Sequence, residues 1–288
     1  ICESAGFDKV WVQPAAGDAG GALGAAYAGW HIYFQKSRNH TDGQDKMRGA
    51  FLGPSFESYD IKNIIEKYNG NYVIYENTDD LLCEVATLLS RQKVVGWFQG
   101  RMEWGPRALG NRSILADPRD PFMQKKLNLK IKFREGFRPF APSIPEENVN
   151  QYFTSFSDNP YMLFTTLLTH NRRISHPVQF EDLPLNEKLN FPNSDIPAVT
   201  HVDYSARVQT VSSDTNPRFY QLLKAFQKIS GCPVLVNTSF NVRGEPLVCT
   251  PEDAYRCFMR TGMDYLVIGN FLLFKNDQEM LERPTAGG

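Results

Sequence analysis

The sequence predicts a mixed α/β domain of the α+β kind. Two short apolar runs, Val94–Phe98 and Pro233–Val236, are typical of strands buried in a sheet. The segment 265–274 contains two further apolar runs around a Gly-Asn turn, which predicts a β-hairpin. The segment 217–231 begins with proline, ends with glycine and carries apolar residues at helical spacing, which predicts a helix among these strands.

The first part of the chain predicts helices joined by a linker. The segment 10–13 has an extended pattern, and 22–30 is rich in small residues that favour a closely packed helix. Residues 41–60 lack periodicity and contain a Gly-Pro turn, so we place a linker there. Helical spacing predicts a helix over 61–68, and we expect Asp79–Asp80 to cap another, with an apolar face made of Leu81, Leu82, Val85, Leu88 and Leu89.

The remaining elements are predicted from equally local signals. An Asp-Pro pair predicts a helix over 120–129. The segment 162–168 is strand-like, and 206–211 alternates like a half-buried strand. Residues 171–200 carry four prolines and predict a long irregular excursion. A capping-box variant predicts a last helix over 250–262.

The composition indicates a folded protein with no overall electrostatic preference. Of the 288 residues, 42% are hydrophobic and 12% aromatic, which excludes a disordered or fibrous chain. The net charge of −1 gives no global basic field for nucleic acid, and no run approaches the roughly 18 apolar residues of a membrane helix. The five cysteines have neither zinc-site nor disulfide-framework spacing, so we expect a cytoplasmic protein: Cys2, Cys83, Cys232, Cys249 and Cys257.

One window of the chain is strongly basic. Between Gln99 and Arg138 there are ten basic residues and four acidic ones, so the rest of the chain is acidic. Such asymmetry predicts a site for an anion. Lys125, Lys126 and Lys130 are also explained by a solvated helix face.

Arg107 and Arg138 stand out within this window. Each has glycine and proline nearby, which fix the backbone and aim the guanidinium for bidentate capture of phosphate or carboxylate. Aromatic neighbours such as Trp104 and Phe137 could wall such a site and exclude water. A structural ion pair with a buried carboxylate is the alternative for each arginine.

Three other positions are candidates for a site. Asn237 and Ser239 follow a predicted buried strand, where open α/β sheets place their ligands, although a self-satisfied polar turn explains them equally well. Asp18, among glycines and alanines, is a candidate metal ligand, but its segment fits neither common phosphate-loop motif. His201 precedes a predicted strand and is a candidate site histidine, with a structural role as the alternative.

Four segments together resemble the O-carbamoyltransferases, a family that includes nodulation-factor, cephalosporin and tobramycin carbamoyltransferases. They are Gly17–Ala26, Gly100–Ile114, Lys132–Pro142 and Asn237–Asn241, and the second and third are highly specific together. The resemblance runs from about residue 1 to about residue 275. It implies a YrdC-like twisted mixed sheet with flanking helices, plus a short remnant of an actin/hexokinase-like domain.

The resemblance implies a division of the chain and of its chemistry. Residues 1–40 would be the tail of an N-terminal carbamoyl-transfer domain, 41–60 a linker and 61–288 a YrdC-like domain that forms carbamoyl-adenylate from carbamoyl phosphate and ATP. The chain would then be the donor-activating part of an ATP-dependent carbamoyltransferase that acts on a hydroxyl of a small molecule. The acceptor stays open among sugars, aminoglycosides, cephems and nodulation factors.

The resemblance also implies roles for the candidate residues. Arg107, Lys132 and Arg138 would be the catalytic cations that hold carbamoyl phosphate and the adenylate phosphate. The nucleotide and carbamoyl phosphate would contact a further group: Arg207, Asn237, Ser239 and, as a candidate, His201. Asp18 matches the family's iron-binding aspartate, whose histidine partners come earlier in such proteins, so we expect iron only in a full-length protein.

The implied cofactors are ATP and Mg²⁺, with the metal held largely by phosphates and water. The implied partners are carbamoyl phosphate, the acceptor and the N-terminal domain; a homodimer is left open. Two alternatives remain. A threonylcarbamoyl-adenylate synthase would share the YrdC-like fold, but the Asp18 segment and the Trp104–Asn111 motif argue against it. A non-catalytic nucleotide-binding or RNA-binding module would use the basic window instead.

Overall fold

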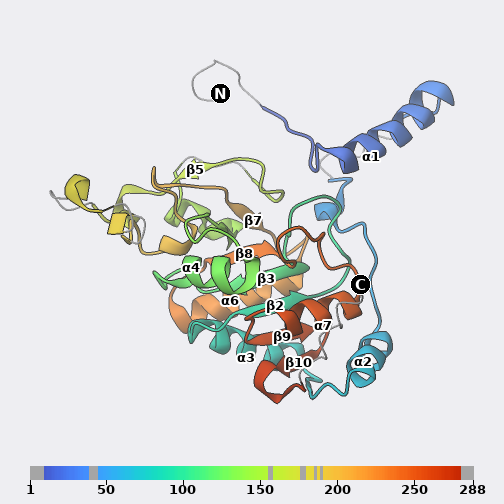
Figure 1. Ribbon diagram of the computed structural model, residues 1–288. Coiled ribbons are helices and arrows are strands. Elements are labelled where there is room, and N and C mark those ends of the chain that lie inside the picture. The colour runs from blue at the N-terminus through green and yellow to red at the C-terminus, as the bar shows by residue number, and fades with distance from the viewer. Residues whose placement is uncertain are drawn as a thin grey trace, which may run out of the picture.

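The computed structural model describes residues 10–38, 45–154, 158–175, 180–184, 187–188 and 191–279. Cys2, Pro177 and the segments 1–9 and 41–44 of the predicted tail and linker lie outside the described residues. Where it is described, the chain forms a large mixed sheet covered by helices, which confirms the predicted α/β fold (Figure 1). Within the described ranges, no helix is both long enough and apolar enough to cross a membrane.

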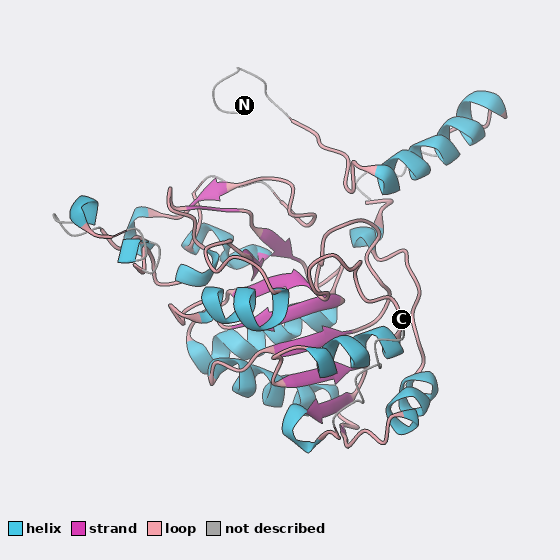
Figure 2. Cartoon of the chain, in the orientation of Figure 1, coloured by secondary structure: helices cyan, strands magenta, loops and turns pink. Residues whose placement is uncertain are grey.

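The sheet has eight strands in the order β1-β10-β9-β2-β3-β8-β4-β7. Figure 2 shows strands of this sheet, in magenta, lying side by side with helices around them. Its strands are β1 (Val73–Ile74), β2 (Val95–Phe98), β3 (Arg112–Ala116), β4 (Ala141–Pro145), β7 (Gln209–Val211), β8 (Leu235–Ser239), β9 (Tyr265–Ile268) and β10 (Phe271–Phe274). β2 pairs with β9 and β4 with β7 in parallel, whereas the other neighbours are antiparallel. A separate two-stranded sheet joins β5 (Thr166–Leu167) to β6 (Ser205–Ala206).

Helices cover both faces of the large sheet. The described α-helices are α1 (Asp18–Ala28), which projects away from the sheet (Figure 1), α2 (Ser58–Lys67), α3 (Thr78–Ser90), α4 (Met123–Leu127), α6 (Pro217–Ser230) and α7 (Pro251–Arg260). α3 and α6 pack against each other on one face, while α4 and α7 lie on the other (Figure 1). Both faces of β2 are buried, which explains why its sequence is an unbroken apolar run.

Local capping explains where the predicted helices begin and end. In α6 the Asn216 side chain accepts a hydrogen bond from the Phe219 amide, and Gly231 ends the helix in the left-handed conformation with φ 74°. A capping box of Thr250 and Asp253 starts α7, as predicted. The predicted apolar face of α3 is buried, but its cap is Asn77 rather than Asp79–Asp80, since Asn77 Oδ1 accepts from the Asp79 amide.

Several predicted boundaries were wrong, each because tertiary pairing overrode a local pattern. The segment 206–211 divides between β6 and β7, which belong to different sheets. Only Thr166–Leu167 of the predicted strand 162–168 pairs. In 120–129 an Asp-Pro turn precedes α4, which starts at Met123 and continues as a π-helical turn to Lys132. Strand β8 extends to Ser239, so Asn237 and Ser239 lie within a strand rather than after it.

The N-terminal helix stands apart from the rest. α1 starts at Asp18, four residues before the predicted start, and a π-helical turn over Gly29–Tyr33 follows it. None of its residues is buried, and Figure 1 shows it projecting from the body that carries the sheet. Its small side chains are therefore not buried, although the Trp104 indole donates a hydrogen bond to the Ala19 carbonyl (3.2 Å) in its first turn.

Candidate functional site

The loop between β2 and β3 is the first part of the candidate site, and a buried carboxylate organises it. Glu103 is 3% exposed. Its Oε1 accepts three backbone hydrogen bonds, from the amides of Leu109 (2.8 Å), Asn111 (2.7 Å) and Arg112 (3.1 Å). A charged acceptor shared by three amides fixes the loop strongly. The turn that carries Arg107 therefore has a defined shape.

Arg112 is buried beneath this loop and is hydrogen-bonded to carbonyls at both of its ends. Its guanidinium is fully buried, lies 3.6 Å from the Phe98 ring centroid, and donates to the carbonyls of Gln99, Gly100, Asn111 and Pro54. Burial lowers the pKa of Arg112 to about 10, and nearby Glu103 opposes this shift. Arg112 is thus an internal support for the loop and has no ligand-facing surface.

Arg107 and Arg207 form the first cationic group of the site. Arg107 is exposed, on the loop that Glu103 shapes, and Arg207 is partly buried just before β7. Burial lowers the pKa of Arg207, and the charge of Arg107 lowers it further, so the two guanidinium groups repel each other electrostatically. Arg207 Nε is buried and has no hydrogen-bond partner among the described residues. Two neighbouring cations with an unpaired donor favour an anionic ligand.

Lys132 forms the second cationic group with the end of β8. Its side chain is 4% exposed and reaches the carbonyl and Oγ of Ser239, and it donates to Asn241 O (3.0 Å) and Oδ1 (2.9 Å). Burial lowers the pKa of Lys132 to about 7, and the charge of Arg134 acts in the same direction. The four oxygen acceptors around the ammonium oppose that shift. Two of the candidate site residues, Lys132 and Ser239, are therefore in direct contact.

Arg138 belongs to a more exposed cluster beside Lys132. It lies 3.9 Å from Glu135, with both side chains about half exposed, and Arg243 lies at the same distance from Glu135. Arg134 donates to Asn128 Oδ1 (2.6 Å) and stacks 5.0 Å from the Phe140 ring centroid. Burial and the charge of Arg138 lower the pKa of Arg134. The cluster carries more positive than negative charge and leaves Arg138 accessible to a ligand.

Asn237 connects the two cationic groups. Its Nδ2 donates to Gln209 Oε1 (2.9 Å) and lies 3.3 Å from the carbonyl of Ala108, next to Arg107. Asn237 and Ser239 are two residues apart on β8, so their side chains lie on the same sheet face. Lys132 contacts Ser239, which shares a sheet face with Asn237. Asn237 in turn contacts Ala108, the residue after Arg107, and Gln209, two residues after Arg207.

Two predicted residues are not joined to this region. His201 lies in the turn before β6, where its backbone amide donates to Ser205 and its carbonyl accepts from Asn193. Asp18 is exposed in the first turn of α1. Nowhere in the described ranges do three His, Cys, Asp or Glu side chains gather as metal ligands, and the expectation of iron in a full-length protein stays a prediction.

Sequence reasoning missed the residues that support the site. Glu103, Arg112 and Gln209 are all buried polar side chains. Glu103 and Arg112 lie in the motif that contains Arg107, but nothing in their local pattern distinguishes a buried charge from an exposed one. Gln209 lies on the predicted strand 206–211, where its inward position was the available signal.

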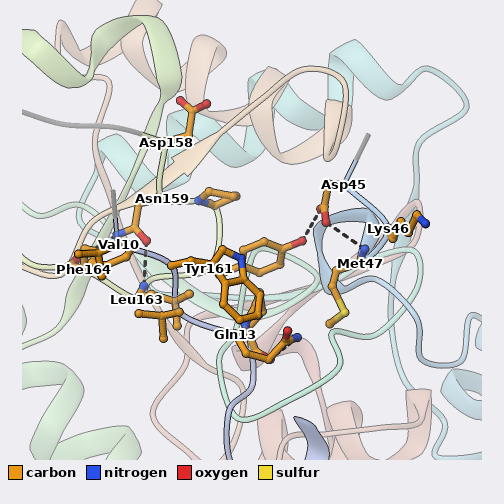
Figure 3. Close-up of a pocket in the computed structure, with 14 residues that line it drawn as sticks. Val10, Gln13, Asp45, Lys46, Met47, Asp158, Asn159, Tyr161, Leu163 and Phe164 are labelled. Carbon is orange, nitrogen blue, oxygen red and sulfur yellow. Dashed lines mark hydrogen bonds between the residues drawn. The ribbon is translucent and has the colours of Figure 1, made fainter. Parts of the chain in front are cut away.

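A separate pocket lies beside the N-terminal segment. Its volume is about 430 Å³, and it is lined by residues 10–14, 45–47, 158–161, 163 and 164 (Figure 3). None of these lining residues is a predicted site residue. The Tyr161 hydroxyl donates to Asp45, whose carboxylate also accepts from the Met47 amide (Figure 3). The Gly49 amide donates to the same carboxylate. Tyr161, Asp45 and the two amides are hydrogen-bonded to one another. The unpaired Arg207 Nε belongs to the candidate site and does not line this pocket.

Comparison with known proteins defines the class. The family model for the carbamoyltransferase C-terminus matches residues 86–275, which include Arg107, Lys132, Asn237 and Ser239. The chain therefore belongs to the carbamoyltransferase family, and the resemblance seen in the sequence is confirmed.

The individual relatives agree with this assignment. The chain is 54% identical over 278 residues to the protein sll1178 of Synechocystis sp., covering 96% of this chain and 45% of the relative. It is 37% identical to the nodulation protein NolNO of Sinorhizobium fredii, covering 93% and 36%, and 36% identical to the nodulation protein NolO of Bradyrhizobium diazoefficiens, covering 93% and 45%. The chain spans less than half the length of these relatives.

Solved structures add little. Two structures of HypF, one from T. kodakarensis, share 20% and 18% identity with this chain and cover 73% and 72% of it, but 22% of their own chains. Their TM-scores of 0.42 and 0.43 are too low to carry an argument. The YrdC-like assignment of the sheet therefore stays a prediction.

Proposed function

We propose that this chain is the donor-activating part of an O-carbamoyltransferase, which forms carbamoyl-adenylate from carbamoyl phosphate and ATP. The observation that carries the proposal is the contact between Lys132 and Ser239 at the end of β8, within the family match. Arg207 adds a buried Nε that has no hydrogen-bond partner among the described residues, and the exposed Arg107 adds a second guanidinium whose charge acts on Arg207. Such an arrangement suits a ligand with several phosphate oxygens.

The proposed reaction has two steps. Water first cleaves carbamoyl phosphate into carbamate and inorganic phosphate. A carbamate oxygen then attacks the α-phosphorus of ATP, the bond to the β-phosphate oxygen breaks, and pyrophosphate leaves. Charge accumulates on phosphate oxygens in the second step, so cations already aimed at those oxygens lower the barrier.

Each candidate residue has a distinct part in this proposal. The guanidinium groups of Arg107 and Arg138 bind phosphate oxygens as forks, and the ammonium of Lys132 acts as a point charge. Arg207 adds its unpaired Nε, while Asn237 and Ser239 supply uncharged polar groups. His201 keeps only the role of a candidate for contact with the nucleotide.

The proposal includes Mg²⁺ as the metal bound with ATP, but it does not use iron. Mg²⁺ would arrive with ATP, held largely by phosphates and water. Iron is expected only in a full-length protein, so no step of this proposal uses it. Transfer to the hydroxyl of an acceptor would require the part of the longer relatives that this chain does not span.

The direct test is pyrophosphate release from ATP and Mg²⁺ by the purified chain, with and without carbamoyl phosphate. Release that requires carbamoyl phosphate supports the proposal. Release that requires threonine and bicarbonate would assign the protein to the threonylcarbamoyl-adenylate synthases. No release from either this chain or a longer form with the preceding domain, combined with salt-sensitive RNA binding, would favour the binding module instead.

The matched variants for this test are two exposed arginines. Arg107→Ala is expected to abolish carbamoyl phosphate-dependent release without unfolding the chain, because its side chain is exposed. Arg91→Ala, also exposed but outside the site, is expected to release pyrophosphate at the wild-type rate. Unchanged release by Arg107→Ala would remove this residue from the site.

A further inference from the structure

The orientation of the Asn237 side-chain amide is fixed by a chain of hydrogen bonds that starts at a backbone carbonyl. The Leu109 carbonyl can only accept, so the group of Gln209 that lies 2.8 Å from it must be the donor Nε2. Gln209 Oε1 then faces Ser143 Oγ (2.6 Å) and Asn237 (2.9 Å). Asn237 must present its own donor, Nδ2, to that oxygen.

The consequence is an acceptor with a fixed direction. Asn237 Oδ1 is turned away from Gln209 and has no hydrogen-bond partner in the described part of the chain. The side chain is 2% exposed, and buried polar atoms without partners are rare in folded proteins. The amide therefore keeps Oδ1 available at a position shielded from water.

The surroundings of this acceptor are those of the proposed site. Asn237 Nδ2 lies 3.3 Å from the Ala108 carbonyl, adjacent to Arg107, and Ser239 on the same sheet face contacts Lys132. The cations on either side provide donors for phosphate oxygens, whereas Oδ1 can only accept. A ligand that satisfies all of them must combine a phosphate with an N–H or O–H group.

We propose that Asn237 Oδ1 accepts a hydrogen bond from the NH₂ of the carbamoyl group, and that Gln209, held by Leu109 and Ser143, is the positioning residue that keeps this oxygen available. This inference rests on the function proposed above. It makes Asn237 the residue that distinguishes carbamoyl phosphate from acyl phosphates with a methyl group in place of NH₂. A site built to hydrogen-bond a ligand N–H rejects an analogue without it, because a buried acceptor is left unpaired.

The test compares the affinities of the purified chain for carbamoyl phosphate and acetyl phosphate by calorimetry. The wild type is expected to prefer carbamoyl phosphate by about tenfold, the scale of one hydrogen bond. Asn237→Ala is expected to bind both equally. Gln209→Met, which keeps Asn237 but frees its amide to rotate, is expected to lose much of the preference. Thermal unfolding shows whether each variant is folded.

A buried amide elsewhere serves as the control. Asn148 is 5% exposed, also has an unpaired Oδ1, and lies in the turn after β4, outside this hydrogen-bond chain. Asn148→Ala is expected to keep the wild-type preference. ATP affinity, measured in parallel, is expected to be the same in all folded variants. A loss of ATP affinity in Asn237→Ala without a change of preference would assign the acceptor to the adenine amine and overturn the proposal.

The remaining outcomes separate the two proposals. If the wild type binds carbamoyl and acetyl phosphate equally, the inference about Asn237 is wrong, while the proposed function stands. The same conclusion follows if folded Gln209→Met and Asn237→Ala both keep a wild-type preference. If the wild type binds neither acyl phosphate, with or without ATP, the proposed function itself fails.

Discussion

The side chains of Gln209 and Asn237 are hydrogen-bonded to each other, with Asn237 Nδ2 2.9 Å from Gln209 Oε1. The bond passes across β4, which lies between β7 and β8 in the sheet. It joins the strand that follows Arg207 to the strand that ends at Ser239. One hydrogen bond between two side-chain amides therefore connects the strand beside Arg207 with the strand whose end contacts Lys132.

Removal of either arginine of the first cationic group is expected to weaken anion binding. Arg107→Ala and Arg207→Ala should each raise the Kd for carbamoyl phosphate by about tenfold or more, because charge-assisted hydrogen bonds are lost. Calorimetric titration measures this, with Arg91→Ala as the exposed control. Equal affinity in wild type and both variants would place the phosphate elsewhere.

Lys132 is expected to make anion binding depend on pH. Its pKa of about 7 means that the ammonium loses its charge as the pH rises through neutrality. Sulfate, which does not titrate in this range, is the suitable probe, and its affinity should fall between pH 6 and pH 8, values chosen to bracket the lowered pKa. Lys132→Met should bind sulfate more weakly at pH 6 and show little of this decline. An identical pH profile in this variant would contradict the expectation.

The same group is expected to make stability rise with pH. Between about 7 and 10.5, the unfolded Lys132 holds a proton that the folded one has lost. The unfolded state binds more protons there, so the free energy of unfolding increases with pH, by at most roughly 1.4 kcal/mol per pH unit. Urea unfolding at pH 7 and pH 9 should show a smaller increase in Lys132→Met. Lys275, with a pKa lowered by burial to about 8, contributes in the same direction, so each lysine variant should remove only part of the rise.

Glu103 is expected to matter for stability as well as for ligand binding. Glu103→Ala leaves three buried amides without their acceptor and Arg112 without its nearest counter-charge. The loss should be about 3 kcal/mol, the scale found when one partner of a buried charged pair is removed. Urea unfolding measures it, with exposed Glu76→Ala as a control that should change little. A loss no larger than that of the control would show that the loop keeps its shape without Glu103.

Two glycines provide a test of close packing at the same loop. Gly110 has φ +109°, and a Cβ there would lie 2.3 Å from the Phe219 ring, whereas Gly244, with φ +83°, faces open space. Both positions disfavour a side chain through their backbone, but only Gly110 adds a steric clash. Gly110→Ala should therefore lower the free energy of unfolding by roughly 2 kcal/mol more than Gly244→Ala. Equal losses would show that Phe219 moves aside at little cost.

The sequence predicted the elements that local signals specify. α6 begins at a proline and ends at Gly231, and the hairpin of β9 and β10 surrounds a Gly-Asn turn, so both were confirmed. Strands β3 and β4 were missed because Arg112 and the prolines of 141–145 interrupt the usual apolar pattern. They are strands because the central sheet buries and pairs them, which is a tertiary effect.

The candidate site was predictable in part for the same reason. Arg107 and Lys132 lie in distinctive motifs, but no local pattern shows that Lys132 is buried against Ser239 or that Arg207 lies near Arg107. Gln209 was missed because its role depends on residues from three other segments. Positions of cations can be read from sequence motifs, whereas the network that orients them arises only from the pairing of distant strands.

Strand β8 lies between β3 and β4 in the sheet, so the proposed anion site can form only after β8 has been synthesised. β8 pairs with β3 on one side and β4 on the other, although both precede it far back in the chain. During synthesis β3 and β4 are made before β8, so they cannot pair with it until the chain has grown past Ser239. Pairing between strands so distant in the sequence forms slowly. A chain that ends before β8 would keep Arg107 and Lys132 but leave the edges of β3 and β4 that face β8 unpaired, which invites aggregation. The proposed anion site and the connection between β3 and β4 therefore both require β8, so a chain that ends before it has no partial version of the site.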